Sequence, residues 1–337
     1  MKKLLIIALY LLASIALSMA VAETSSDIAA RLGRGINILG YDPIWKNPDE
    51  AHFKPRYFKM LHDSGFQTVR VNLQAFCHMD AQNRLDEAWL KTLNSVVHQA
   101  TAAKLNVILD EHDYRVCGQD FELCRTKLFA FWQQIAPRYK DAPSSVLFEL
   151  MNEPNKAITP ALWNSMIPEL LSVVRKTNPK RWVVIGPANS NNFRSLDALE
   201  LPAADRNIIV TIHYYDPFAF THQGATWTNP SRENMTGVPW GSQADRHKMK
   251  DNFAVMARWA EEHRRPIFVG EFGAYEKAAM PDRAAWTAAI ARTAEAHHFA
   301  WAYWQFESSF SAYDLKSDSW IKPIYTALIP STNTILH

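Results

Sequence analysis

Two glutamates in this sequence lie at the ends of apolar runs that are typical of buried strands. Glu153 comes after the run LFELM, and Glu271 comes after the run IFVG. A protonated and an ionised carboxyl group together can cleave a glycosidic bond, because the acid protonates the leaving oxygen while the carboxylate stabilises or attacks the anomeric carbon. Carboxyl groups ~5 Å apart imply retention of configuration and ~6.5–9.5 Å implies inversion. The sequence alone leaves that distance open.

Polar residues at the ends of other apolar runs suit supporting roles around this pair. We expect Arg70 to keep Glu271 ionised through charge-assisted hydrogen bonds, whereas Glu153 needs a raised pKa to act as the acid. Tyr215 is expected to orient Glu271, and Asn152 to bond the sugar 2-hydroxyl group.

The same strand ends carry further candidates. His112 and His213 are expected to be hydrogen-bonding partners of the pair, and Trp304 offers an apolar face for a sugar ring. Asp110, His78 and Gln305 also lie at such ends. A barrel selected for stability alone would not need this pattern.

Eight short, mostly apolar runs alternate with helix-like stretches, and this alternation would bring the candidates together. The runs cover residues 35–39, 68–73, 106–110, 146–151, 182–186, 208–213, 266–271 and 300–305. Helical periodicity is clear in residues 86–103, 123–139, 160–176, 244–263 and 282–298, and weak around 194–199. Eight such repeats predict an α/β fold, a single (β/α)8 TIM barrel, whose functional residues gather at the C-terminal ends of the strands.

The N-terminal region has the pattern of a secretory signal peptide. Two lysines precede an apolar run at residues 4–17, and a small-x-small pattern ends at Ala22. We therefore expect residues 1–22 to be a signal peptide and 23–337 to be the barrel catalytic domain of a secreted or periplasmic protein. The apolar run is too short to span a bilayer, and a net charge of +2 with mixed signs does not favour nucleic acid. We expect no membrane segment in the mature protein.

Cys117 and Cys124 are expected to form a disulfide, because they are seven residues apart and the expected compartment is oxidising. Cys77 would remain free, and we interpret it as a buried thiol, the commoner case. The cysteine spacing is not a zinc signature. No metal and no cofactor are expected.

Aromatic residues in the loops are candidates for stacking against sugar rings. The longest connection without a helix, residues 216–243, contains Trp227 and Trp240, and loops of that length usually have a function. Trp45, in the loop after the first run, is either a sugar platform or a lid residue.

Six segments together resemble glycoside hydrolase family five, over about residues 35–328. They are TVRVNL, DEHDY, FELMNEP, HYY, VGEFG and WAYWQF, in the expected order. The resemblance implies a retaining barrel enzyme with Glu153 as acid/base and Glu271 as nucleophile. It also implies supporting positions for a set of residues: Arg70, His78, His112, Asn152, His213, Tyr215 and Trp304. Many members have a tryptophan shortly after the arginine of the second strand, where this chain has Ala75 and Phe76, so the resemblance does not define the contacts in the first subsites there.

The leading hypothesis is an exported endo-β-1,4-glucanase, expected to be monomeric, whose partner is a cellulose-like or mixed-linkage β-glucan. A mannanase or another β-glycan hydrolase of the same family is an open alternative, and a carbohydrate-binding protein without catalysis is another. A metal-dependent barrel hydrolase is disfavoured, because the sequence lacks paired histidines at the first strand. A phosphate-binding barrel is disfavoured because no glycine-rich loop follows the last two strands.

Overall fold

Eight strands, nearly all of whose residues are buried, pair in chain order and in parallel to form a closed barrel. The computed structural model describes residues 24–330. The barrel closes where β1 pairs with β8, with Gly35 opposite Ala302. The strands are β1 (Arg34–Ile38), β2 (Thr68–Leu73), β3 (Asn106–Glu111), β4 (Val146–Glu149), β5 (Val183–Ile185), β6 (Ile208–His213), β7 (Ile267–Phe272) and β8 (Ala300–Tyr303). The predicted (β/α)8 barrel is confirmed.

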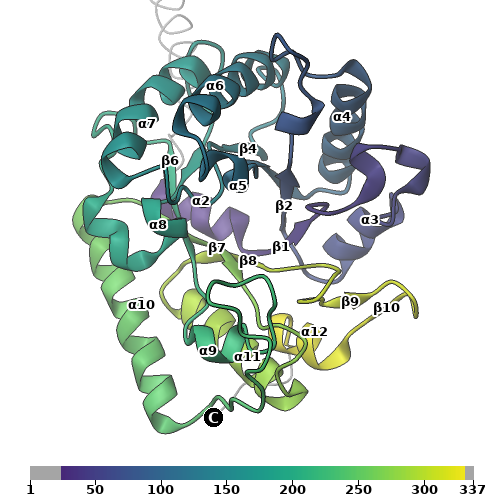
Figure 1. Cartoon of the computed structure of the whole chain (residues 1–337), viewed down its shortest axis with the longest axis vertical. Coiled ribbons are helices and arrows are strands. Elements are labelled where there is room, and N and C mark those ends of the chain that lie inside the picture. Colours follow the sequence, from purple (N-terminus) through teal and green to yellow (C-terminus); the bar gives the residue numbers. More distant parts are fainter. Residues whose placement is uncertain (1–23, 331–337) are drawn as a thin grey trace, which may run out of the picture.

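Helices surround this barrel, and Figure 1 shows α4, α6, α7 and α10 outside the strands. The α-helices are α2 (Ser25–Leu32), α3 (Arg56–Asp63), α4 (Glu87–Ala102), α5 (Tyr114–Cys117), α6 (Phe121–Arg138), α7 (Pro160–Arg175), α8 (Ala188–Asn191), α9 (Phe218–Thr221), α10 (Gln243–His263), α11 (Met280–Ala296) and α12 (Lys322–Leu328). The 3-10 helices are η1 (Pro43–Trp45), η2 (Pro48–Glu50), η3 (Phe76–His78) and η4 (Phe193–Ala198), and a hairpin of β9 (Tyr313–Asp314) and β10 (Ser319–Trp320) follows β8. Only α8 and η4 lie between β5 and β6, as the weak periodicity there indicated.

Side-chain caps set where the long helices begin. Asp86, Asp120 and Thr159 each accept a hydrogen bond from a backbone N–H in the first turn of α4, α6 and α7. Ser242 and Asp245 form a reciprocal capping box at the start of α10. Such caps satisfy backbone donors that a helix cannot pair internally. They explain why the predicted and observed starts of α4, α7 and α10 agree closely.

The apolar core has two parts, divided by the barrel wall. The larger part fills the space between strands and helices, whereas the smaller lies inside the barrel and includes Ile108, Leu147 and Phe268. Ile28 and Leu32 of α2 join the inner cluster. Helix α2, which was not predicted from the sequence, therefore closes the lower end of the barrel, where the strands begin.

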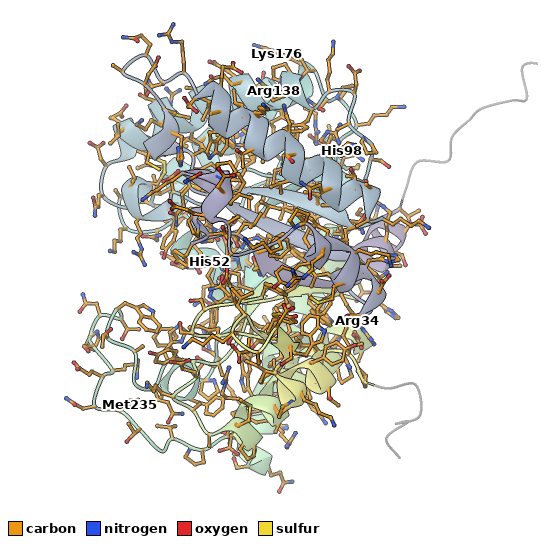
Figure 2. The ribbon with its side chains drawn as sticks, turned by 90° about the vertical axis from the view of Figure 1, so that its right-hand side faces the viewer. Arg34, His52, His98, Arg138, Lys176 and Met235 are labelled. Carbon is orange, nitrogen blue, oxygen red and sulfur yellow. A yellow bond between two sulfur atoms is a disulfide. The ribbon has the colours of Figure 1, made fainter. Side chains whose placement is uncertain are left out.

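The upper end of the barrel carries the long connections. Figure 2 shows Arg34, at the start of β1, and Met235, in the loop between α9 and α10, on opposite sides of the molecule. That loop therefore lies on the side where the strands end.

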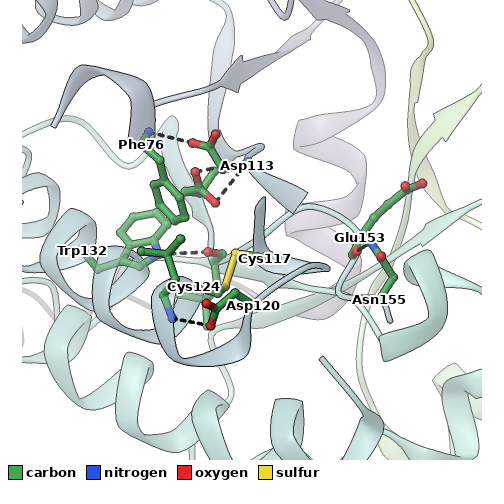
Figure 3. Close-up of a disulfide and its surroundings, with 11 residues drawn as sticks. Phe76, Asp113, Cys117, Asp120, Cys124, Trp132, Glu153 and Asn155 are labelled. Atoms are coloured by element: carbon green, nitrogen blue, oxygen red, sulfur yellow. Dashed lines mark hydrogen bonds between the residues drawn. A yellow bond between two sulfur atoms is a disulfide. The ribbon is translucent and has the colours of Figure 1, made fainter. Parts of the chain in front are cut away.

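The predicted disulfide is present between Cys117 at the end of α5 and Cys124 in α6 (Figure 3). Cys77 is free, but it is exposed, so the expectation of a buried thiol was wrong. The reason is local: Cys77 lies in η3, a short surface turn between Phe76, which is buried, and His78. The predicted signal peptide lies outside the described residues. Among residues 24–330, no helix combines the length and the apolarity that crossing a membrane requires.

Candidate active site

Glu153 and Glu271, far apart in sequence, meet at the upper end of the barrel. Glu271 lies in β7, and Glu153 lies four residues beyond the last residue of β4. One oxygen of each carboxyl group and one ring nitrogen of His213 all lie within 4.8 Å of one another. The closed barrel explains this geometry, because the C-terminal ends of all parallel strands converge on one mouth.

Arg70 is fully buried below this pair and binds three carboxyl groups. Its Nε and Nη2 atoms donate to both oxygens of Glu149, at 2.7 and 2.8 Å. Nη1 donates to Oε1 of Glu271 at 2.8 Å, and Nη2 lies 3.1 Å from Oδ2 of Asp110. Burial raises the pKa of Glu149 to about 7 even though Arg70 opposes that shift. One guanidinium thus shares its charge among three acids.

Two donors hold the carboxylate of Glu271 in place. Arg70 donates to Oε1, and the Tyr215 hydroxyl donates to Oε2 at 2.9 Å. Burial together with the charge of Glu271 raises the pKa of Tyr215 well above its usual range, so Tyr215 remains a donor at any ordinary pH. Both oxygens of Glu271 therefore accept a hydrogen bond, which fixes the rotation of its carboxyl group.

Glu153 has a different environment from Glu271. Its Oε1 lies 2.8 Å from Nδ1 of His213, and burial raises its pKa to about 7. Its backbone has φ = +43°, a left-handed conformation that is uncommon for a residue with a side chain. The neighbouring Asn155 side chain donates to the carbonyl of Glu153 at 2.6 Å (Figure 3). Glu153 and Glu271 thus differ in their partners: Glu153 faces His213, whereas Glu271 accepts from Arg70 and Tyr215.

His112 connects this network to an aromatic wall. Its Nδ1 lies 2.6 Å from Oδ2 of Asp110, and its ring stacks on Trp304 with ring centroids 5.6 Å apart. Asn152 accepts from Arg70 through Oδ1 at 2.8 Å, and its amide nitrogen lies 3.4 Å from Nε2 of His112. These contacts fix the orientation of the Asn152 amide beside Glu153.

The pair opens into a cleft of about 380 Å³. Its polar lining includes Glu153, Glu271, Asn152 and His213. Aromatic residues form much of the remaining wall: Tyr41, Tyr114, Phe193, Tyr215, Phe218, Trp227, Trp304 and Phe310. Trp227 is half exposed and lies in the long loop, where a stacking residue was expected. Such a polar centre with aromatic walls suits a sugar chain.

Three of the residues predicted to contact the sugar do not reach this cleft. Trp45 is buried against Trp89, its Nε1 donates to the carbonyl of Leu39, and it lines a separate cavity between α4 and η1 together with His78. Trp240 is also buried and packs under the guanidinium of Arg246. Both tryptophan rings pack against protein atoms, so the prediction that Trp45 and Trp240 are sugar platforms was wrong. The substrate contact predicted for His78 is not formed in this cleft either.

Sequence reasoning missed Glu149 and Asn37, which complete the polar floor. Asn37 accepts from Arg70 at 2.9 Å and donates to the carbonyl of Gly270. Glu149 sits inside the run VLFE, where it looks like part of an apolar strand. Strand periodicity could have indicated that Glu149 points into the barrel, because it lies two residues beyond the inward-facing Leu147 and so shares its face.

Two groups of residues in the described range have the composition of a metal site. One is Glu153, His213 and Glu271, and the other is Asp42, His52 and Glu307 near the end of β8. In the first group, the His213 nitrogen is already hydrogen-bonded to Glu153. In the second, Asp42 accepts backbone N–H groups through both oxygens.

Comparison with known proteins agrees with this geometry. The sequence model of the family described as Cellulase (glycosyl hydrolase family 5) matches residues 29–309. Endoglucanase H of Acetivibrio thermocellus is 27% identical over 285 residues, which cover 82% of this chain and 30% of that protein. This chain covers only 30 to 55% of the first curated relatives it matches.

Solved structures of Cel5A from Thermotoga maritima are similar over their full length. One, described as a complex with cellobiose, is 36% identical with a TM-score of 0.86, covering 90% of this chain and 100% of that one. Another, described as a complex with mannotriose, is 35% identical with the same TM-score and the same coverage. With the barrel, the paired glutamates and the family match in agreement, the chain belongs to glycosyl hydrolase family 5.

Proposed function

We propose that this protein is an endo-β-1,4-glucanase that hydrolyses cellulose-like or mixed-linkage β-glucans with retention of configuration. The observation that carries the proposal is the pair Glu153 and Glu271, with carboxyl oxygens within 4.8 Å of each other across the cleft floor. Retaining glycosidases hold their two carboxyl groups ~5–5.5 Å apart, whereas inverting enzymes leave ~6.5–9.5 Å for a water molecule. The separation here favours direct attack by Glu271.

The reaction would proceed in two steps. Protonated Glu153 gives its proton to the glycosidic oxygen as the bond from that oxygen to the anomeric carbon breaks, and Glu271 forms a covalent ester with the same carbon. Glu153, now ionised, then takes a proton from water, whose oxygen attacks the anomeric carbon and releases Glu271. The sugar leaves with its original configuration because two inversions cancel.

The surrounding residues support each step. Arg70 and Tyr215 donate to the two oxygens of Glu271 and hold its carboxyl group in one orientation. Burial raises the pKa of Glu153 to about 7, so a protonated fraction is available near neutral pH. Asn152 has a fixed amide at the cleft floor, which suits a hydrogen bond to the sugar 2-hydroxyl group. Trp304, stacked on His112, would support a pyranose ring.

A β-mannan is the second candidate substrate. The similar T. maritima Cel5A has structures described as complexes with cellobiose and with mannotriose, so this kind of cleft accommodates both sugars in that protein. Glucose and mannose differ in the orientation of the 2-hydroxyl group, which lies near Asn152 in the proposed mechanism. Initial rates on carboxymethylcellulose, barley glucan, mannan and xylan would rank the substrates.

The decisive test compares the wild type with Glu271→Gln on the preferred polysaccharide. We expect release of reducing sugar to fall at least 1000-fold, because amide nitrogen and oxygen cannot form the glycosyl ester. Glu169→Gln, an exposed glutamate paired with Arg125 in α6, is the matched control and should keep full activity. Equal rates in wild type and Glu271→Gln would instead favour a binding protein without catalysis.

Retention is tested separately by ¹H NMR of the first products formed. Early accumulation of the β-anomer would support retention, and early α-anomer would contradict it. Activity that persists after dialysis against a chelator would further exclude a metal-dependent hydrolase.

We also propose that the protein is exported from the cytoplasm. Cleavage near Ala22 would release a secreted or periplasmic protein, and we further propose that the mature enzyme acts as a monomer. Mass spectrometry of the mature N-terminus and light scattering of the purified protein test these points.

A further inference from the structure

Asn191 lies directly behind His213, on the side opposite the two glutamates. Its side chain is fully buried, and its Nδ2 lies 3.2 Å from Nε2 of the imidazole. The other ring nitrogen, Nδ1, lies 2.8 Å from Oε1 of Glu153 and 3.5 Å from Oε2 of Glu271. His213 is therefore held between an amide and the two carboxyl groups.

The backbone around Asn191 has an unusual conformation, which places its side-chain amide beside His213. Asn189, Ser190 and Asn191 all have φ between +53° and +61°, a left-handed conformation that costs free energy for residues with a side chain. The turn also contacts the residue after Glu153, because the N–H of Ser190 donates to the carbonyl of Pro154 at 3.0 Å. The segment thus reaches Glu153 through the backbone and through His213.

Gly186 provides the room that the Asn191 side chain needs. A Cβ atom at position 186 would lie 2.0 Å from Oδ1 of Asn191, a distance that no side chain allows. The glycine after β5 and the left-handed turn that follows it therefore both allow the Asn191 side chain to lie beside His213. Oδ1 has no hydrogen-bond partner among the described residues. The only polar contact of the Asn191 side chain shown among those residues is the one to His213.

The direction of the hydrogen bonds follows from the charges around the ring. Nδ1 faces oxygens of two carboxyl groups, and Glu271 already accepts from Arg70 and Tyr215, so a hydrogen atom on Nδ1 is preferred to a bare lone pair. A neutral ring then has its lone pair on Nε2, which accepts from the amide N–H of Asn191. The opposite amide orientation would require Nε2–H and would aim a lone pair at both carboxyl groups.

We propose that Asn191 is a positioning residue: its amide N–H occupies Nε2 of His213, so that the imidazole stays neutral and presents Nδ1–H to Glu153. The proposal rests on the proposed function, since it assigns Asn191 a part in keeping Glu153 an acid. A doubly protonated ring would place a full positive charge 2.8 Å from Glu153 and favour its ionised form. An ionised Glu153 cannot protonate the leaving oxygen.

The charges facing the ring agree with a neutral state. Burial lowers the pKa of His213 to about 3, with Arg70 and His112 acting in the same direction and Glu271 and Asp110 against it. For Glu153, burial raises the pKa, Asp110 adds to this, and His112 and Arg70 oppose it. A carboxylate in place of the Asn191 amide would change this balance at Nε2.

Asn191→Asp tests the proposal with a side chain of nearly the same shape. The new carboxylate would accept from Nε2–H, so His213 should become doubly protonated. We expect kcat/KM on β-glucan to fall about 100-fold at pH 7, with a smaller loss on aryl glycosides that need little protonation. The alkaline limb of the pH profile should move to lower pH. Asn191→Leu should lower kcat about tenfold while leaving that limb in place, because the ring stays neutral but less well oriented.

The ring state is measured directly by ¹⁵N NMR of histidine-labelled protein, with His213→Gln identifying the signal. We expect a neutral Nδ1–H form in the wild type and an imidazolium in Asn191→Asp. This readout needs no activity, so it separates failure of this proposal from failure of the proposed function. Asn164→Ala, which loosens the same β5–β6 connection at Ala198 without touching His213, is the control. An Nε2–H form in the wild type, or a neutral ring and an unmoved pH profile in Asn191→Asp, would overturn the proposal.

Discussion

Arg70 is one positive charge among three buried carboxyl groups, and this imbalance shapes the chemistry of the cleft floor. Burial pushes the pKa of Asp110 upward, but the charges of Arg70 and His112 bring it below its ordinary value. Glu149, with two hydrogen bonds to the same guanidinium, still has a pKa raised to about 7 by burial. Removing one partner of such a buried group costs about 3–5 kcal/mol, so we expect the network to be required for stability.

The raised pKa of Glu153 predicts a pH dependence for the wild type. The acid must be protonated, so kcat/KM should fall as pH rises through about 7. In Glu153→Ala, this limb should disappear, and activity should be lost mainly on unactivated glucans and retained better on aryl glycosides with good leaving groups. Rates of both substrates measured from pH 4 to 9 check the prediction. Equal loss on both substrates would contradict the acid role.

At the level of secondary structure, the disulfide joins two short stretches beside the cleft. Cys117 ends α5, which follows His112, and Cys124 lies in the first turns of α6. Asp113, at the start of α5, accepts from the backbone N–H of Phe76 at 2.8 Å, so the same stretch also holds the β2–α4 connection (Figure 3). The disulfide therefore constrains two connections at the mouth of the barrel.

Replacing both cysteines with serine should destabilise the protein by about 2–3 kcal/mol, the loop-entropy value for a bridge across seven residues. Urea unfolding measures this loss. Cys77→Ser is the matched control, because Cys77 is exposed and unpaired, and it should leave the free energy of unfolding nearly unchanged. A double serine variant as stable as the wild type would refute a stabilising role.

At the scale of the whole molecule, the two ends of the barrel differ: one is open and the other is closed by a helix. The upper end holds the cleft, while α2 closes the lower end with Ile28 and Leu32, both almost completely buried. Arg31 of the same helix donates to Oδ1 of Asn106 at 2.8 Å, which attaches α2 to the start of β3. The cleft and the closing helix thus lie at opposite ends of one barrel.

Ile28→Ala should therefore lower stability without changing the chemistry. We expect a loss of about 2–5 kcal/mol, the usual cost of an Ile→Ala cavity in a well-packed core. Below the unfolding transition, kcat should stay within a factor of two of wild type. Val255→Ala, at an exposed site on α10, is the control and should cost little. Urea unfolding and steady-state rates at 25 °C distinguish the two effects, and a large fall in kcat would contradict the separation.

The amino-acid sequence was sufficient to predict the barrel, the meeting of Glu153 with Glu271, and the contacts of Arg70 and Tyr215 with Glu271. These follow from local periodicity and from one geometric rule, that parallel strands of a barrel end at a common mouth. Even the bounds of β2 and β6 agree with the predicted residues 68–73 and 208–213.

Folding in three dimensions decided which loop side chains face the cleft. The sequence gives no reason to distinguish among three loop tryptophans, Trp45, Trp227 and Trp240. Of these three, only Trp227 lines the cleft, because the path of a long connection depends on contacts between distant segments. The same holds for Asn191, which approaches His213 only because Gly186 and a left-handed turn let it. Strand periodicity is a local property of the chain, whereas the direction of a loop side chain is set by what packs against it.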